Sequence, residues 1–113
     1  MCNQVTLNQI TSKIVRAAKA SLGDKLEKVI LYGSYARGDY DAESDIDIMI
    51  LANIPREDAN RVWDQIWDIT GDLGLDYGVM VSVHVKDSGT FYKFVNDLPF
   101  YSNVERDGVV LSA

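Results

Sequence analysis

Two short apolar runs surround a segment of this chain that is rich in glycine and aspartate, and this pattern constrains the fold more than any other. Gly33 and Ser34 directly follow the first run, and after ten intervening residues Asp45 and Asp47 lead into the second. Because alternate residues of a strand point to the same side, the two aspartates are predicted to share one face, opposite Ile46. The segment therefore predicts a strand, a glycine turn and a second strand that begins with paired carboxylates.

The combination of paired carboxylates with a glycine turn has a chemical meaning. Two like charges this close are costly unless a cation lies between them, and carboxylate oxygens are ligands that Mg²⁺ uses beside substrate phosphates. The turn at Gly33 and Ser34 offers backbone amides and a hydroxyl to an anion. The two halves together predict a site for a phosphate compound bound with a metal ion.

The same residues resemble the nucleotidyltransferase signature of the DNA polymerase β superfamily, specifically that of its minimal nucleotidyltransferases. In that family a Gly-Ser pair is separated by ten residues from Asp-x-Asp, and this chain has the same spacing. The similarity extends to residues 36–38, 75–79 and 99–109 and to Ser44, which is expected to support its turn rather than to touch substrate. An ordinary strand–turn–strand with acidic edge residues would explain any one of these residues, but not all of them in this register.

The resemblance implies roles for five residues. Asp45 and Asp47 would hold Mg²⁺ or Mn²⁺, while Gly33 and Ser34 would hold the triphosphate of the donor, ATP. Arg37 is the best candidate for a phosphate contact by its charge and position. A nucleoside monophosphate, AMP in the first hypothesis, would pass to a hydroxyl acceptor while pyrophosphate leaves.

Each phosphate-binding candidate also has a purely structural explanation. Any tight turn favours a glycine such as Gly33, and Ser34 is a suitable cap for a following helical turn. Arg37 is equally well explained as a surface side chain that pairs with Asp39 or Glu43.

One position departs from the family pattern. Many members carry a third carboxylate on the third strand, whereas the polar-facing positions of this strand hold Met80, Ser82 and His84. Ser82 or His84 occupies the place of that carboxylate, and His84 could act as a base because histidine titrates near neutrality. A half-buried packing role is more common for a lone histidine on a strand. Without a third carboxylate, nucleotide and metal binding are still expected, and the open question is whether the protein catalyses transfer.

The resemblance also implies a protein partner. Many stand-alone family members are paired with a helical HEPN protein in toxin–antitoxin modules, where they adenylylate and silence the toxin. A HEPN-family partner is therefore expected to carry the acceptor hydroxyl. The alternative is a non-catalytic nucleotide-binding or antitoxin module that neutralises its partner by binding. A transferase acting on a small molecule, for which an additional substrate-binding domain is usual, is the third hypothesis.

Composition limits the other classes of function. The 113 residues predict one domain, 1–113, and the single cysteine cannot form an internal disulfide. No apolar run reaches the length of a membrane span and the N-terminus lacks the build of a signal peptide, so a cytoplasmic protein is expected. A net charge of −6 disfavours broad nucleic-acid binding and suits a basic protein partner. Whether the protein forms an oligomer is left open.

Periodicity and capping signals predict the order of the elements. Helical segments are expected at 6–21, at 34–38, from Pro55 to 71–74, at 89–96 and after Pro99, and strands at 26–32, 45–51 and 77–85. The first two strands must run antiparallel if the glycine turn and the aspartates are to reach one nucleotide. The expected fold class is α/β (α+β), with a small mixed three-stranded sheet and about four flanking helices packed mainly on one face.

Overall fold

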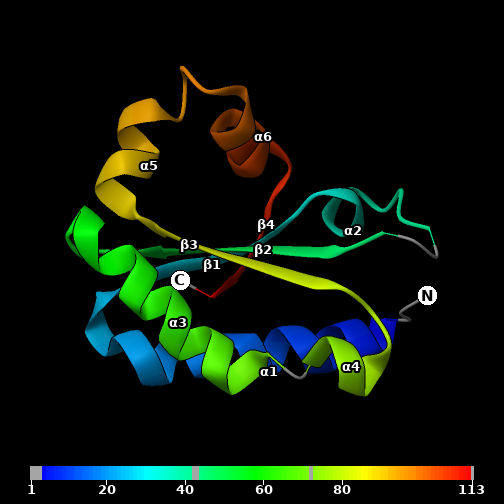
Figure 1. The fold of residues 1–113 in the computed structure, drawn as a ribbon. Helices are drawn as coiled ribbons and strands as arrows, with labels where there is room; N and C mark the ends of the chain where they lie inside the picture. Colours follow the sequence, from blue (N-terminus) through cyan, green and yellow to red (C-terminus); the bar gives the residue numbers. More distant parts are fainter. Residues whose placement is uncertain (1–3, 42–43, 72, 113) are drawn as a thin grey trace.

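The computed structural model describes residues 4–41, 44–71 and 73–112, which form one sheet with helices on both sides (Figure 1). The strands are β1 (Leu26–Tyr32), β2 (Ile46–Ala52), β3 (Val81–Asp87) and β4 (Val109–Ser112). The helices are α1 (Gln4–Leu22), α2 (Ser34–Arg37), α3 (Ala59–Thr70), α4 (Leu73–Tyr77), α5 (Ser88–Phe94) and α6 (Pro99–Asp107), with short 3₁₀ turns at Gly23–Lys25 and Arg56–Asp58.

The sheet is mixed, with the strand order β3-β2-β1-β4. β1 pairs antiparallel with both β2 and β4, whereas β2 and β3 run parallel. The predicted fold class and the predicted antiparallel pairing of the first two strands are confirmed. The expectation of three strands and about four helices was too low, because the described residues contain four strands and six α-helices. The added strand, β4, lies on the edge of β1 that β2 leaves free.

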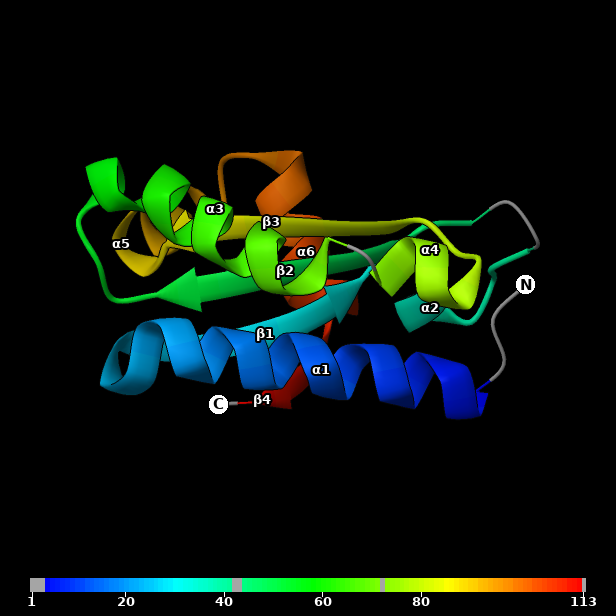
Figure 2. The ribbon, with the colours of Figure 1, turned by 60° about the horizontal axis from the view of Figure 1, so that its bottom comes forward.

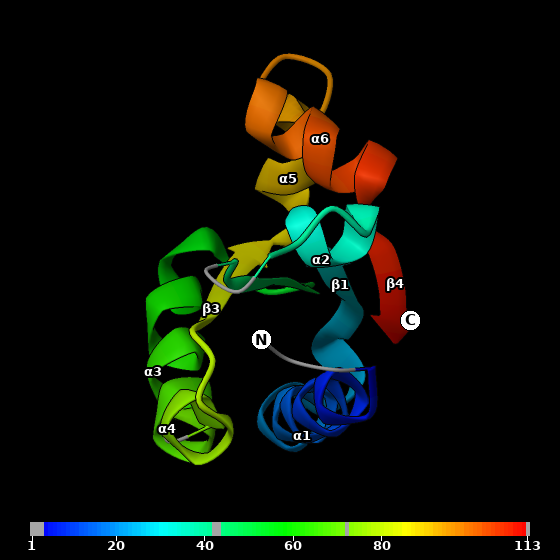
Figure 3. The same cartoon turned by 90° about the vertical axis from the view of Figure 1, so that its right-hand side faces the viewer.

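Helices cover both faces of the sheet, which corrects the expectation that they pack mainly on one face. In Figures 1 and 3, α1, α3 and α4 lie on one side of the strands and α5 and α6 on the other. Figure 2 shows α1 and α3 running side by side over the first face, where the Ser21 hydroxyl donates to Gln65 Oε1 at 2.7 Å. β2 is therefore a central strand with apolar neighbours above and below.

The core is divided between these two faces because side chains alternate along a strand. Ile46, Ile48 and Ile50 point toward α1 and α3 and are fully buried there. Met49 and Leu51 point the other way and pack with side chains of α5 and α6. Both faces of β2 are apolar along most of its length. Asp47, near the beginning of the strand, is its only polar residue.

Several predicted boundaries were wrong, by one to four residues. The first helix begins at Gln4 rather than at Thr6. The third strand begins at Val81 rather than at Tyr77, because the preceding residues form α4 and Gly78 then turns the chain with a φ of 67°. This turn redirects the backbone from the helical layer into the sheet, where β3 adds alongside β2.

Candidate active site

The glycine turn and the aspartates meet at the end of β1 and the start of β2. In the antiparallel ladder Tyr32, the last residue of β1, lies opposite Asp47. Gly33 and Ser34 continue directly from Tyr32, and Asp45 immediately precedes β2. The pairing register thus brings together the four residues that the sequence placed in two separate segments.

Two physical features favour glycine at position 33. Its φ of 77° lies in the left-handed region, which residues with a side chain rarely adopt. A Cβ at this position would also lie only 2.5 Å from the Asp47 Oδ2 atom. The missing side chain therefore lets the turn approach the carboxylate directly, and the backbone of Ala36 and Arg37 closes the turn by donating to the Gly33 carbonyl at 3.1 Å.

The two aspartates differ in exposure and influence each other. Asp45 is exposed, whereas Asp47 is partly buried at the start of β2. Burial raises the pKa of Asp47, and the negative charge of Asp45 raises it further, while His84 and Arg37 act in the opposite direction. Burial, followed by the charge of Asp47, also raises the pKa of Tyr32 well above its usual range. This corner of the sheet is an electronegative site in which the carboxylates repel each other.

The neighbouring strand places Ser82 beside Asp47. These two residues are partners in the parallel ladder between β2 and β3, so their side chains lie on the same face. His84 is two residues further along this face, with its ring centroid 6.4 Å from those of Tyr32 and Phe100. It is exposed, which corrects the expectation that it is half-buried. Ser82 therefore occupies the position next to the aspartates where a third carboxylate was sought.

Arg37 is held near the site by an acidic neighbour. Its Nε atom lies 3.1 Å from Asp39 Oδ2, which confirms one of the two pairings that the sequence offered. The other, Glu43, lies outside the described residues. Arg37 also lowers the pKa of Asp47, so its positive charge is felt at the carboxylate pair. A phosphate contact by Arg37 stays a prediction.

Ser34 and Ser44 have different places in the loop. Ser34 is the first residue of α2, and its carbonyl accepts the backbone N–H of Gly38 at 2.9 Å. The helix cap is Gly33 rather than Ser34, so the capping role considered for the serine hydroxyl was wrong. Ser44 Oγ accepts the N–H of Asp41 at 2.9 Å, which confirms its predicted role in supporting the turn.

A small cleft beside the turn contains residues that the sequence reasoning missed. It has a volume of about 170 Å³ and lies between the end of β1, the α2 turn and α6. Arg37 and Gly33 line one side, and Phe100, Asn103 and Asp107 of α6 line the other. The only signal in the sequence was the family-like stretch at 99–109, which carried no assigned role.

The sequence of this protein matches one family model over most of its length. The model describes a nucleotidyltransferase domain and covers residues 12–111. The chain belongs to the nucleotidyltransferase domain family. This membership confirms the resemblance on which the roles of the Gly-Ser turn and the Asp-x-Asp pair were based.

Relatives of this nucleotidyltransferase support the same family. Two proteins of Methanocaldococcus jannaschii, whose names propose protein adenylyltransferase activity, are 38% and 35% identical to it. The matches cover 88% and 89% of this chain and 91% and 94% of the respective relatives. The similarity is therefore not confined to the motif.

Solved structures share the fold of this nucleotidyltransferase. A candidate nucleotidyltransferase from Sulfolobus solfataricus superposes with a TM-score of 0.60 at 24% identity, over 95% of this chain and 80% of the other. A chain from a toxin–antitoxin complex with AMP-PNP superposes with a TM-score of 0.55 at 21% identity, over 90% of this chain and 72% of the other. At these identities the likeness establishes the fold.

The residues of this nucleotidyltransferase fit a divalent cation held by two carboxylates. Within the described ranges, no group of three or more His, Cys, Asp or Glu side chains is arranged to hold a metal ion. Mg²⁺ commonly takes only one or two carboxylates and completes its shell with substrate phosphates and water. Asp45 and Asp47 match this pattern, since a cation would relieve the repulsion that contributes to the raised pKa of Asp47.

None of the helices described for this nucleotidyltransferase has the combination of length and apolar character that crossing a membrane requires.

Proposed function

We propose that this nucleotidyltransferase transfers AMP from ATP to a hydroxyl group on a partner protein, with Mg²⁺ or Mn²⁺ bound by Asp45 and Asp47. One observation supports the proposal: the Tyr32–Asp47 register brings a side-chain-free turn close to the Asp47 carboxylate. In this proposal the triphosphate lies along Gly33 and its bound cation meets Asp47. A simple structural turn would not need this close approach to an acidic side chain.

The reaction would use this chain mainly for positioning and for balancing charge. Gly33 and Ser34 would hold the triphosphate, and Arg37 would offset part of its negative charge. When bound, the cation would neutralise the phosphate oxygens and orient the α-phosphorus for attack. The acceptor oxygen would bond to the α-phosphorus as the bond to the bridging oxygen breaks, so pyrophosphate leaves and AMP remains on the acceptor.

The proton of the acceptor hydroxyl needs a destination, and β3 limits the choices. Ser82 lies beside Asp47 but cannot accept a proton as a carboxylate does. His84 is exposed on the same face near Asp47, and in its neutral form it is the histidine base considered for this step. A slow reaction that releases the proton to water would need neither side chain.

A protein acceptor and an AMP donor are supported by the relatives. The names of the two M. jannaschii proteins propose adenylylation of protein. Two of the structural neighbours come from toxin–antitoxin complexes, one of them with AMP-PNP. We therefore propose a toxin of the HEPN family as the partner, in keeping with the modules in which minimal nucleotidyltransferases occur.

A second candidate function is favoured by one residue. Ser82, one of the two residues considered for the place of the third carboxylate, lies beside Asp47 and is not acidic. A missing carboxylate would slow catalysis without removing the cation and triphosphate contacts. The protein would then neutralise its partner by binding alone. Retention of both Asp45 and Asp47 favours the enzyme, because a module that only occludes its partner has no need of a costly carboxylate pair.

Calorimetry with ATP tests the donor site. Wild-type protein should bind ATP in the presence of Mg²⁺, and both omission of Mg²⁺ and the Asp45→Asn change should abolish binding. Asp24→Asn removes an exposed carboxylate from the turn after α1 and serves as the matched control. ATP binding that survives Asp45→Asn and the absence of Mg²⁺ would contradict the assigned cation site.

The intact mass of a candidate HEPN protein distinguishes the two functions. After incubation with this protein, ATP and Mg²⁺, the transferase predicts a partner heavier by one or more AMP groups. A stable complex in which the partner mass is unchanged would favour neutralisation by binding. Asp47→Asn protein provides the control, since it should form no adduct.

A further inference from the structure

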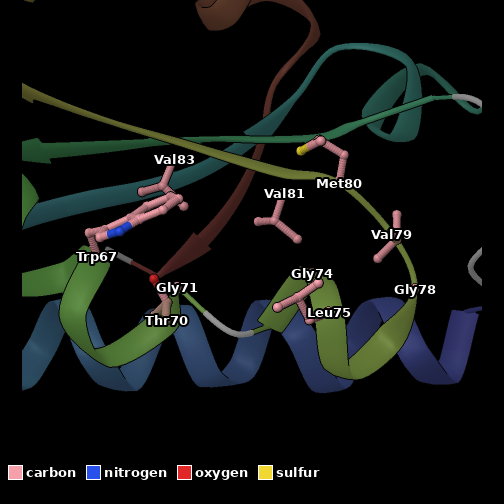
Figure 4. Close-up of a pocket in the computed structure, with 10 residues that line it drawn as sticks. All are labelled: Trp67, Thr70, Gly71, Gly74, Leu75, Gly78, Val79, Met80, Val81 and Val83. Atoms are coloured by element: carbon pink, nitrogen blue, oxygen red, sulfur yellow. The ribbon is translucent and has the colours of Figure 1, made fainter.

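A groove lies on the face of the sheet opposite Asp47, between β3 and the residues at the end of α3 and in α4 (Figure 4). Its volume is about 320 Å³. We name it the β3 groove: Trp67 forms one end, Leu75 and Met80 border the other, and Val81 lies between them. None of these residues belongs to the nucleotidyltransferase motif.

The walls of the β3 groove expose large apolar side chains. The exposed fractions are 50% for Trp67, 84% for Leu75 and 65% for Met80. Single exposed apolar residues are common, but large ones gathered around a hollow mark binding surfaces. The three side chains together therefore indicate a site for an apolar group.

Trp67, the aromatic wall of the groove, is held in place by contacts within this chain. The ring of Trp67 stacks on that of Trp63, with centroids 5.4 Å apart and an interplanar angle of 16°. Trp63 is itself fixed, because its Nε1 atom donates to the Val83 carbonyl at 2.9 Å. A rigid aromatic side chain loses little entropy on binding, which is why such residues serve as anchors at interfaces.

Glycines keep the floor of the groove free of side chains. A Cβ on Gly74 would lie 2.7 Å from the Val79 carbonyl oxygen, and one on Gly71 would lie 2.8 Å from that of Trp67. Both obstacles are backbone atoms, which cannot move aside cheaply. The hollow is thus built into the close approach of α3, α4 and the start of β3, and is not a gap left by a flexible side chain.

The segments that supply the β3 groove are acidic, and we call Asp68 and Asp76 its rim because they directly follow the lining residues Trp67 and Leu75. Residues 62–85 contain four aspartates and no lysine or arginine. The three aspartates that the structure describes, Asp64, Asp68 and Asp76, are all exposed. None of the three has an ion-pair partner among the described residues, and Asp68 directly follows the aromatic wall residue Trp67. Free carboxylates around an apolar hollow complement an apolar group flanked by positive charges.

The backbone of β3 at the groove limits how an extended partner could bind. β3 is an edge strand, and the Ile46 N–H donates to the Met80 carbonyl at 2.9 Å, so the backbone groups of Met80 and of the even-numbered residues after it point toward β2. The backbone of Val81 consequently faces away from β2, and its nitrogen lies 4.0 Å from the Cβ position of Gly74 in the groove floor. The Val83 carbonyl, which faces the same way, already accepts the hydrogen bond of Trp63 Nε1, so a partner chain would use the groove mainly through its side chains rather than by adding a strand along β3.

We propose that the β3 groove binds an extended, basic segment of a partner protein. A large apolar side chain of that segment enters between Trp67 and Leu75, and flanking lysine or arginine side chains meet Asp68 and Asp76. A second copy of this chain is a poor occupant, because two acidic rims would face each other. The groove lies on the sheet face opposite Asp47, so the inference is independent of the proposed transfer reaction.

Fluorescence anisotropy with a labelled peptide of about ten residues tests the proposal. The probe alternates lysine with valine and leucine around a central phenylalanine. Two comparison peptides replace its lysines by glutamate or its apolar residues by serine. Only the basic apolar peptide should bind, and its affinity should fall as salt is added. Equal binding of the serine peptide, or no binding of the basic apolar peptide, would overturn the proposal.

Two pairs of variants locate the peptide on the surface. Leu75→Ser with Met80→Ser should weaken binding at least about tenfold, whereas Val5→Ser with Leu98→Ser, which also removes two exposed apolar side chains, should not. Similar effects from both pairs would overturn the assignment to the groove. Circular dichroism verifies that each variant is folded.

A charge series and the oligomeric state complete the test. Asp68→Asn with Asp76→Asn should weaken the peptide about threefold, while the control pair Asp24→Asn with Asp97→Asn has the same net charge and should leave it unchanged. Equal effects would indicate non-specific attraction to an acidic protein and overturn the proposal. Analytical ultracentrifugation measures the oligomeric state. A dimer that Leu75→Ser dissociates would overturn the proposal, because the groove would then bind a second copy of this chain.

Discussion

The two faces of the sheet carry surfaces of opposite character, although β3 contributes residues to both. On one face a glycine turn and two aspartates form a charged corner, and nearly all of its residues come from one contiguous segment, residues 33–47. On the other face, α3, α4 and β3 surround the apolar β3 groove with an acidic rim. A site whose residues lie in one short segment can therefore be found in the sequence, whereas a surface assembled from several elements cannot.

Asp47→Asn is expected to give the largest difference between its effects on ligand binding at the two faces. Loss of this carboxylate should weaken Mg²⁺-dependent ATP binding by more than about tenfold, because even indirect disturbance of a metal site costs about 10–100-fold. Peptide binding at the β3 groove should be unchanged. Calorimetry with ATP and anisotropy with the peptide measure the two sites separately. A loss at both sites would mean that the two faces are coupled.

Gly33→Ala should destabilise the fold through its contact with Asp47. A left-handed φ costs a residue with a side chain about 1–2 kcal/mol, and the new Cβ would also meet Asp47 Oδ2 at 2.5 Å. Gly38→Ala is the matched control, because Gly38 has a φ of 83° and nothing within 4 Å of its Cβ position. Urea unfolding should show the larger loss for Gly33→Ala. Equal losses would show that the approach to Asp47 is not tight.

Trp63→Phe is expected to affect the groove face alone. The change removes the donor to the Val83 carbonyl at 2.9 Å and should cost about 1 kcal/mol of unfolding free energy. It also loosens the support of Trp67, so peptide binding should weaken, while Mg²⁺-dependent ATP binding should not change. A matching decrease in ATP affinity would contradict the independence of the two faces.

The smallest expected effect is on the pH dependence of stability. The pKa of Asp47 is raised in the folded protein, so the native state holds its proton more tightly than the unfolded chain. Stability without divalent cations should therefore decrease as pH rises from about 4 through the folded pKa. Asp47→Asn should flatten this part of the profile and raise Tm slightly at pH 7. Thermal unfolding in the presence of a chelator measures both, and an unchanged profile would contradict the shift.

Much of the catalytic face could be predicted from residue order. The bounds of β1 were predicted correctly, and the antiparallel pairing followed from the need to bring Gly33 to Asp47. The position of Ser82 beside Asp47 also agrees with the alternation expected along the third strand. These predictions succeeded because strand alternation and turn geometry act over only a few residues.

The wrong predictions concern residues whose structure depends on contacts with segments far away in the sequence. The pattern around Tyr77 fitted a strand, but α4 forms there because Leu73 is buried against the core of α1 and α3. His84 was expected to be half-buried, yet neighbouring elements leave it exposed. The α6 side of the cleft, including Asn103, had no signal of its own that would place it beside the glycine turn.

The sequence by itself determined the family, the order of most elements and the residues of the charged corner, because a glycine turn, a strand and paired carboxylates each follow from local sterics and charge. Only the tertiary structure decided which apolar side chains remain uncovered. Trp63 and Trp67 are one helical turn apart and look alike in the sequence, but one is anchored to β3 and the other is half exposed in a glycine-floored groove. Burial depends on contacts between segments far apart in the chain, and those contacts exist only once the sheet and both helical layers are assembled.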